Sequence, residues 1–454
     1  MFKIFTPQEA EESILKRVPL DDFPVSSRIL DGIEAIFGER LSPDEAVRRI
    51  LHDVRTAGDA GLQVWSAKLD GLDTRDFRVP EEKIRAALDK ISAEEREAIQ
   101  IAAERIRRFY RNQPLSSWIM QEGDGTLGQL VRPIRRVGIY VPGGTAPLPS
   151  TVLMAAIPAQ VAGVGEIAIA VPPERKTGEV APITLAAAAL LGLDEVYTLG
   201  GAQAIGALAF GTETIPAVDK IYGPGNLFVT LAKRQVYGTV GIDGLAGPTE
   251  TMVIADETAN PEWVAADLLA QAEHDVLASA VLLTSSEELA GRVQAAVGQQ
   301  IETLPRAEIT AKSLANRSGI VLTKDLAESV ELANAYAPEH LCLAVTDPFK
   351  ASEKISAAGG IFIGEYSCEV LGDYVAGPSH VMPTSGTARF ASPLNLWDFV
   401  HLVSLIALDG DSAAELSGPA GLLARSEGLE AHARAADCRG ADLQTGESLN
   451  MDQD

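Results

Sequence analysis

Three short stretches of the chain gather side chains that bind metals or transfer protons. The first, QAEHD at 271–275, ends an apolar helical run and carries Gln271 and His274 three positions apart. On a helix this spacing places both side chains on one face, which is a common arrangement for two metal ligands. Taken alone, the pair is more typical of a solvated helix end, so a metal site needs support from the other stretches.

The second stretch, PEHL at 338–341, places an acid beside a base directly after a proline. Adjacent side chains point in different directions, so Glu339 and His340 could serve separate proton transfers. The third stretch, GDYVAGPSH at 372–380, is predicted to be a glycine-punctuated loop from which Asp373 turns inward, or else a plain turn. We expect one chemistry to need all three stretches.

Composition limits the class of protein. Hydrophobic residues make up 46% and charged residues 22% of the 454 residues, and no apolar run approaches the ~20 residues that a membrane span requires. The first residues show no basic-then-apolar secretory leader. The net charge of −25 argues against nucleic acid and anionic membranes as partners, because phosphate binding depends on clustered Lys and Arg. We therefore expect a cytoplasmic protein that binds neither.

The metal-binding residue types are few and unevenly placed. The three cysteines, Cys342, Cys368 and Cys438, form no CxxC pair, so any metal must use His, carboxylate or amide ligands. Four of the six histidines lie in polar stretches that could form a site, which favours a functional use for them: His274, His340, His380 and His432.

The elements that must position these residues follow from periodicity. Residues 43–112 repeat apolar side chains at i, i+3 and i+4, which predicts long helices. Short apolar runs then alternate with helical segments, a pattern typical of parallel sheets. The runs fall into two groups, at 137–222 and 252–364, and two such α/β units facing each other would enclose a cleft. The runs are RVGIYV, EIAIAV, EVYTLG, KIYG, ETMVIA, SAVLLT, GIVLT, CLAV and GIFIG.

Glycine-rich stretches follow several of these runs. VPGGTAPLPS, LGGAQAIGAL and YGPGNLFVT each lead from a predicted strand into a predicted helix, whose free N–H groups could receive a phosphate. Glycine at such turns also serves packing, but three of them in one domain favour a nucleotide or another anionic ligand. GDGTLG at 123–128 has the spacing of a dinucleotide fingerprint, yet it neither follows a strand nor opens a helix, so we expect a turn there.

Eight stretches together resemble the histidinol dehydrogenase family, in order, from about residue 30 to 437. They are GIYVPGGTAPLPSTVLM, GGAQAIGALAFGTETIP, DKIYGPGN, GLAGPTETMVIAD, LLAQAEHD, APEHL, GDYVAGPSHVMPT and EGLEAHARA. The resemblance implies a zinc-dependent homodimer that oxidises L-histidinol to L-histidine through histidinaldehyde with two NAD+, in the last two steps of histidine biosynthesis. It also implies an α/β fold with two incomplete Rossmann-like parallel-sheet domains facing a cleft, and helical N-terminal and C-terminal extensions involved in dimerisation.

The resemblance also implies a role for individual residues of this chain. Glu339 and His340 are the implied acid–base pair, His380 lines the pocket, and His432 reaches into the site of the partner subunit. The implied zinc ligands are Gln271, His274, Asp373 and His432. The implied substrate contacts are Thr249, Gln271, His274, His340, Asp373, Glu427 and His432. The implied NAD contacts are Tyr140, Gln203 and Asn226.

We expect the chain to divide into five segments. These are an N-terminal arm at 1–37, a first α/β domain with long helices at 38–138 plus 251–393, a second, NAD-binding α/β domain at 139–250, a C-terminal dimerisation segment at 394–439, and a disordered tail at 440–454.

One departure from the family pattern concerns the substrate pocket. The chain reads AGPTE where the family commonly reads AGPSE, so Thr249 keeps the hydroxyl and adds a methyl group that could narrow the pocket. The nearest alternative is a related dehydrogenase branch that acts on sulfonated propanediols. EGLEAH, with Glu427 and His432, favours histidinol, because a sulfonate calls for cationic side chains.

Two other classes of protein remain as alternatives to this interpretation. A metallohydrolase would use zinc to generate hydroxide and would turn over without NAD+. A solute-binding protein would hold a ligand in the cleft and form no NADH. The absorbance of NADH, on mixing the protein with histidinol, NAD+ and zinc, separates all three.

Overall fold

The structure is a computed structural model that describes residues 2–19, 25–122, 125–143 and 147–441. It divides into two compact units, one formed by Met1–Gln113 with Ile134–Phe399 and the other by Pro114–Pro133 with Val400–Asp454. Within the described ranges, no helix is long and apolar enough to cross a membrane. The division into five segments stays a prediction, and residues 442–454 of its tail lie outside the described ranges.

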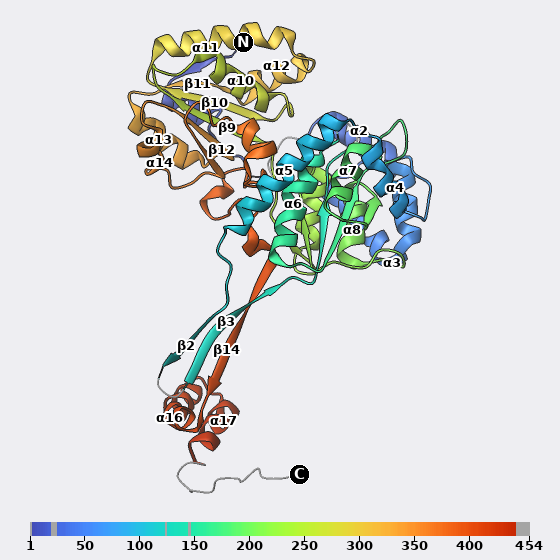
Figure 1. Cartoon of the computed structure of the whole chain (residues 1–454), viewed down its shortest axis with the longest axis vertical. Helices are drawn as coiled ribbons and strands as arrows, with labels where there is room; N and C mark the ends of the chain where they lie inside the picture. Colours follow the sequence, from blue (N-terminus) through green and yellow to red (C-terminus); the bar gives the residue numbers. More distant parts are fainter. Residues whose placement is uncertain (1, 20–24, 123–124, 144–146, 442–454) are drawn as a thin grey trace. The chain divides into compact units, whose positions relative to one another are not determined.

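The first unit contains two parallel sheets, which confirms the predicted fold class (Figure 1). One has six strands in the order β1-β11-β10-β9-β12-β13. Its strands are β1 (Ile4–Phe5), β9 (Glu250–Ala255), β10 (Ser279–Thr284), β11 (Gly319–Leu322), β12 (His340–Ala344) and β13 (Gly360–Ile363). β9, β10 and β12 are buried along their whole length, as expected for strands covered on both faces.

Helices cover both faces of this six-stranded sheet. Alternate side chains of β9 belong to different cores, Val253 to one and Met252 to the other, because successive residues of a strand point to opposite faces. The Val253 core includes residues of α10 (Pro261–Ala272), α11 (Glu287–Gln300) and α12 (Ala307–Asn316). The Met252 core includes residues of α1 (Pro7–Glu12), α13 (Leu326–Tyr336) and α14 (Pro348–Ser352).

The second parallel sheet has five strands in the order β6-β5-β4-β7-β8. They are β4 (Arg136–Tyr140), β5 (Glu166–Val171), β6 (Val196–Thr198), β7 (Lys220–Tyr222) and β8 (Gly241–Ile242). The chain runs from β4 outward to β6 and then returns to β7 on the other side of β4. In open parallel sheets a ligand crevice lies at such a switch, beyond the carboxyl ends of the strands.

Helices complete this second half of the unit. α6 (Pro149–Ala162), α7 (Pro182–Leu190), α8 (Gly201–Phe210) and α9 (Leu227–Val236) connect the strands. The predicted N-terminal helices are present as α3 (Pro43–Leu69), α4 (Glu81–Ala86) and α5 (Ala93–Arg111), preceded by α2 (Ser27–Phe37). α3 bends at Gly58, whose φ of 54° is left-handed, and its apolar side chains share one core with α8 and α9.

The second unit is a three-stranded antiparallel sheet with two helices. β14 (Val400–Leu408) pairs with β3 (Gly125–Pro133), which pairs with β2 (Trp118–Glu122), and α16 (Gly410–Ser426) packs against α17 (Glu430–Ala441). Our prediction of a turn over GDGTLG was wrong for Gly125–Gly128, which lie in β3; Gly123 and Asp124 lie outside the described residues. The alternation that predicts a strand is weak here, because neither face of β3 is fully buried.

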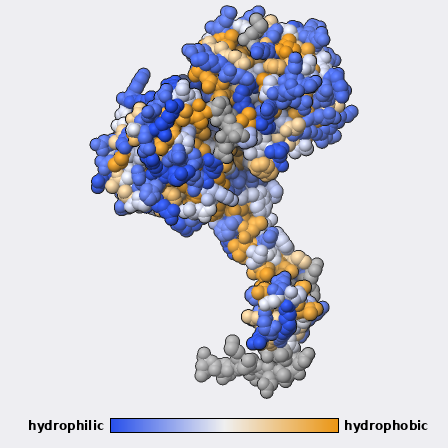
Figure 2. Space-filling view, turned by 180° about the vertical axis from the view of Figure 1, so that it is seen from behind, coloured by the Kyte–Doolittle hydropathy of each residue, from blue (hydrophilic) through white to orange (hydrophobic). Residues whose placement is uncertain are grey.

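The second unit buries little of its own apolar surface. Gly421 is the only buried residue of α16 in the described structure, and Ala433 is buried in α17. Large apolar side chains remain exposed, including Ile406 at 70%, Leu422 at 70% and Leu423 at 65%. Figure 2 shows apolar side chains on the surface of this unit. Exposed apolar surface of this kind is typical of interaction sites.

Candidate functional site

A cluster of polar side chains lies at the amino ends of β9 and β12. His340, the first residue of β12, pairs in register with Thr251 of β9. The Thr249 hydroxyl donates a hydrogen bond to Oε2 of Glu339 over 2.6 Å, and the backbone N–H of Glu250 donates to the same oxygen over 3.0 Å. The Glu339 side chain is buried, and this burial raises the pKa of its carboxyl to about 7.

His340 is held at both ring nitrogens. Nδ1 lies 3.0 Å from Nε2 of Gln271 and 3.2 Å from the backbone oxygen of Glu250, and Nε2 lies 3.2 Å from Oδ1 of Asp373. Desolvation lowers the pKa of His340, but the negative charges of Glu339 and Asp373 outweigh it, so the pKa is raised to about 10. Glu339 and His340 therefore stand side by side in different hydrogen-bonding environments.

Gln271 and His274 reach the cluster from the end of α10. The helix ends at Ala272, and the N–H of His274 donates to the backbone oxygen of Gln271 over 3.2 Å, so His274 occupies a turn directly after the helix. Gln271 is 1% exposed, whereas His274 keeps an exposed surface. Partial desolvation lowers the pKa of His274, although Asp373 and Glu273 act in the opposite direction.

Asp373 does not lie in a loop, as the glycine-punctuated sequence led us to predict. It lies in a single π-helical turn, Gly372–Ala376, which continues the short helix α15 (Glu369–Leu371). Such turns are rare and often occur at functional sites. Nδ1 of His380 lies 2.8 Å from the backbone oxygen of Asp373, so His380 belongs to the same cluster.

Glu369, which sequence analysis did not single out, is buried and interacts electrostatically with His340 and Asp373. Burial raises the pKa of its carboxyl to about 8, and the positive charge of His340 acts against this rise. Its position four residues before Asp373 was the only signal in the sequence, and that signal depends on the helical conformation of the segment.

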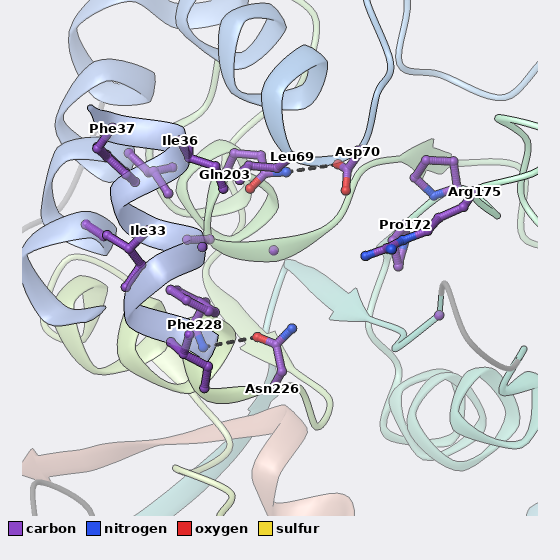
Figure 3. Close-up of a pocket in the computed structure, with 18 of the residues that line it drawn as sticks. Ile33, Ile36, Phe37, Leu69, Asp70, Pro172, Arg175, Gln203, Asn226 and Phe228 are labelled. Atoms are coloured by element: carbon purple, nitrogen blue, oxygen red, sulfur yellow. Dashed lines mark hydrogen bonds between the residues drawn. The ribbon is translucent and has the colours of Figure 1, made fainter. Parts of the chain in front are cut away.

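A second site lies at the carboxyl ends of the five-stranded sheet, at the switch in strand order. A cavity of about 400 Å³ there is lined by residues that follow β4, β5, β6 and β7, together with residues of α2 and the end of α3. The three residues assigned to NAD by sequence analysis, Tyr140, Gln203 and Asn226, all line it. Figure 3 shows Ile33, Ile36, Phe37 and Phe228 on one side of this cavity, and Asp70 with Arg175 on the other.

The NAD-assigned residues also hold the local backbone. The Tyr140 hydroxyl accepts a hydrogen bond from the N–H of Gly201 over 3.2 Å, and Asn226 caps α9 by accepting from the N–H groups of Phe228 and Val229. Gln203 is fully buried and its Nε2 donates to Oδ2 of Asp70 over 2.9 Å. The predicted strand–turn–helix junctions thus converge on one cavity.

Two of the predicted site residues belong to the second unit. Glu427 is the residue that ends α16, and His432 lies in the first turn of α17. Both side chains are exposed. The hydrogen-bonded cluster around His340 consists, among the described residues, of residues of the first unit.

The chain is similar in sequence and in structure to known proteins. A family model described as histidinol dehydrogenase matches residues 39–440. A histidinol dehydrogenase from Deinococcus radiodurans is 51% identical over 434 residues, which cover 95% of this chain and 99% of that relative. One from Thermus thermophilus is 52% identical over 396 residues, which cover 87% of this chain and 94% of that relative. The crystal structure of histidinol dehydrogenase from Elizabethkingia anophelis matches with a TM-score of 0.89 and 36% sequence identity, covering 98% of this chain and 99% of that one.

Proposed function

This chain belongs to the histidinol dehydrogenase family, and from that membership we infer that it is an NAD-dependent dehydrogenase of the last two steps of histidine biosynthesis. It oxidises L-histidinol to L-histidine through histidinaldehyde and uses two molecules of NAD+. The observation that best supports this function is the pair of buried neighbours Glu339 and His340, which have separate hydrogen-bond partners. Two oxidations at one site need two proton acceptors with different tasks.

His340 takes the proton of the histidinol hydroxyl in the first oxidation, as hydride leaves the carbinol carbon. A proton acceptor must be neutral, and the neutral tautomer that leaves Nε2 free carries its proton on Nδ1, which can donate to the backbone oxygen of Glu250. Asp373 stabilises the protonated ring, and it would do so less if it held a metal ion. His340 then acts through Nε2, the nitrogen that faces Asp373.

Glu339 serves the second oxidation. The aldehyde must add water before it can lose a second hydride, and Glu339 removes a proton from that water. A carboxyl group with a pKa near 7 suits this task, because it accepts protons readily at neutral pH. Thr249, which donates to the same carboxylate, positions it and contacts the substrate.

The residues of the cluster fit a zinc ion. Gln271, His274 and Asp373 offer an amide oxygen, an imidazole nitrogen and a carboxylate oxygen, all of which bind zinc. Among the described residues, no group of three or more His, Cys, Asp or Glu side chains is arranged to hold a metal, so one chain supplies an incomplete set. We propose that Gln271, His274 and Asp373 would hold the ion together with His432 of the partner subunit. When bound, zinc serves as a template that orients the imidazole and amine of histidinol.

Replacing His274 by Ala should lower zinc content and activity together, each at least about tenfold, because a lost ligand weakens the hold on the metal. Metal analysis after dialysis, with activity measured on the same samples, checks this. His52→Ala, a change at an exposed histidine of α3, is the matched control and should alter neither. Full zinc occupancy with activity retained in His274→Ala would mean that QAEHD is only a helix end.

We propose that the protein is a homodimer with composite sites. The second unit exposes large apolar side chains that a partner copy would cover, and it carries Glu427 and His432 on its surface. His274, one of the proposed zinc ligands, is also exposed and is therefore accessible to a histidine from another chain. An isologous two-fold dimer would complete both sites at once.

Two NADH should form for each histidinol consumed, because the site retains the aldehyde until it is oxidised again. The absorbance of NADH, with limiting histidinol in the presence of NAD+ and zinc, measures this ratio. Formation of one NADH together with free histidinaldehyde would contradict the two-step assignment. Turnover of histidinol without NADH would contradict the proposed function itself.

A further inference from the structure

The cavity lined by Tyr140, Gln203 and Asn226 has an apolar side and a polar side. Ile33, Ile36 and Phe37 of α2 and Phe228 of α9 form the apolar side, which suits the flat face of an adenine ring (Figure 3). Asp70 and Arg175 lie on the polar side, beyond Gln203. A nucleotide with its base among the apolar side chains therefore places its sugar beside Gln203 and Asp70.

The negative charge of Asp70 is energetically unfavourable at this position. It follows the last turn of α3, where the exposed backbone carbonyl groups of the helix disfavour a negative charge. Desolvation raises the pKa of its carboxyl, while the Gln203 amide and the Gly200 N–H act in the opposite direction. Its Oδ2 accepts from Gln203, and a carboxylate has further lone pairs to accept from a ligand.

Gln203 is an independent observation that points to a polar ligand in this part of the cavity. Its side chain is fully buried and its Oε1 has no hydrogen-bond partner among the described residues. A buried polar atom without a partner is unfavourable, so Gln203 presents one unsatisfied acceptor beside the Asp70 carboxylate. Ribose hydroxyl groups are donors that suit these two acceptor groups.

We propose that Asp70, held by Gln203, accepts hydrogen bonds from the adenosine ribose hydroxyl groups of NAD and thereby makes this enzyme discriminate against NADP. The inference rests on the proposed assignment of this cavity to NAD. A 2′-phosphate would place a second negative charge against the carboxylate. The acidic residue that reads the ribose in other dinucleotide sites follows a strand, whereas Asp70 comes from the end of a helix that precedes the sheet.

The simpler role of Asp70 is structural, because its carboxylate also lies against Gly200 at the start of α8. A Cβ atom added to Gly200 would meet Oδ1 of Asp70 at 3.2 Å. If holding this turn were its only role, replacing Asp70 would weaken the binding of every adenine nucleotide equally. The two roles therefore predict different ratios of the affinities for ADP and for 2′-phospho-ADP. A change in overall stability would not alter this ratio.

Asp70→Asn tests the proposal with ADP and 2′-phospho-ADP as calorimetric probes. The variant keeps the size of the side chain and removes its charge. We expect ADP to bind about tenfold more weakly and the preference for ADP over 2′-phospho-ADP to fall about a hundredfold, because a hydrogen bond to a charged group and a like-charge contact are both lost. The preference in kcat/KM for NAD over NADP should fall in parallel.

Asp73→Asn is the matched control. Asp73 is exposed three residues further along, accepts from Gln63 and does not line the pocket. It removes the same charge and should leave the preference unchanged. A preference that is equal in wild type and Asp70→Asn, or lowered as much by Asp73→Asn, would overturn the proposal.

The wild-type protein provides a test that needs no folded variant. 2′-Deoxy-ADP lacks one hydroxyl group and should bind at least about tenfold more weakly than ADP; equal affinities would overturn the proposal. None of these binding measurements uses histidinol. Failure to form NADH from histidinol with normal discrimination among the nucleotides would therefore contradict the proposed function alone.

Discussion

A mixture of His340→Ala chains and His432→Ala chains, each inactive alone, should regain roughly a quarter of wild-type activity when the two are unfolded and refolded together. His340 belongs to the cluster of the first unit, and His432 is exposed on the second unit. In a composite dimer, each mixed dimer has one site with both defects and one site with neither. Random pairing makes about half of the dimers mixed, and half of their sites are intact.

The control for this experiment pairs two defects of the same half-site. His274→Ala and His340→Ala both alter the first unit, so every site of their mixed dimers carries one defect and the activity should not rise above that of the parents. If His432 completed the site of its own chain, the first mixture would also stay inactive. Recovery in the first mixture alone, measured as NADH formation against refolded wild type, would establish that the site uses both chains.

Replacing Glu339 by Gln should slow the second oxidation by about 10²- to 10⁴-fold while the first is largely spared, because only the second needs a proton removed from water. The amide retains an oxygen that can accept from Thr249 and Glu250, so the local structure should persist. The change also removes the negative charge 3.7 Å from Nδ1 of His340, which favours the neutral ring that the first step requires. Histidinaldehyde should accumulate with one NADH per histidinol.

Single-turnover kinetics with histidinol and with histidinaldehyde separate the two steps. Glu353→Gln, which changes an exposed glutamate after α14, is the matched control and should slow neither. Equal loss of both oxidations in Glu339→Gln would contradict the division of labour between the two neighbours.

The pH dependence of the second oxidation provides a further check on Glu339. Burial raises the pKa of its carboxyl to about 7, and only the deprotonated form can accept a proton from water. The rate of aldehyde oxidation should therefore rise with pH through about 7 and level off above it. In Glu339→Gln this rise should disappear.

Local sequence patterns predicted most of the fold. The apolar runs that we expected to be strands, such as ETMVIA and SAVLLT, form β9 and β10, since a strand buried on both faces has no polar positions to obscure the pattern. The long helices from residue 43 are present for the same kind of reason, since one face of each is buried. β3 and β14 escaped prediction because their side chains remain partly exposed within one chain.

The sequence by itself determined which residues are able to perform the chemistry, since Gln271, His274, Glu339, His340 and Asp373 stand in stretches whose composition and family resemblance identify them. Only the tertiary structure decided where they meet. The cluster lies at the amino ends of β9 and β12, although ligands of open parallel sheets usually bind at the carboxyl ends, where the cavity lined by Tyr140, Gln203 and Asn226 lies. Asp70 and Gln203 are 133 residues apart and meet only because α3 packs against α8. Contacts of this kind depend on how helices and strands pack across long separations in the chain, and no local periodicity encodes that packing.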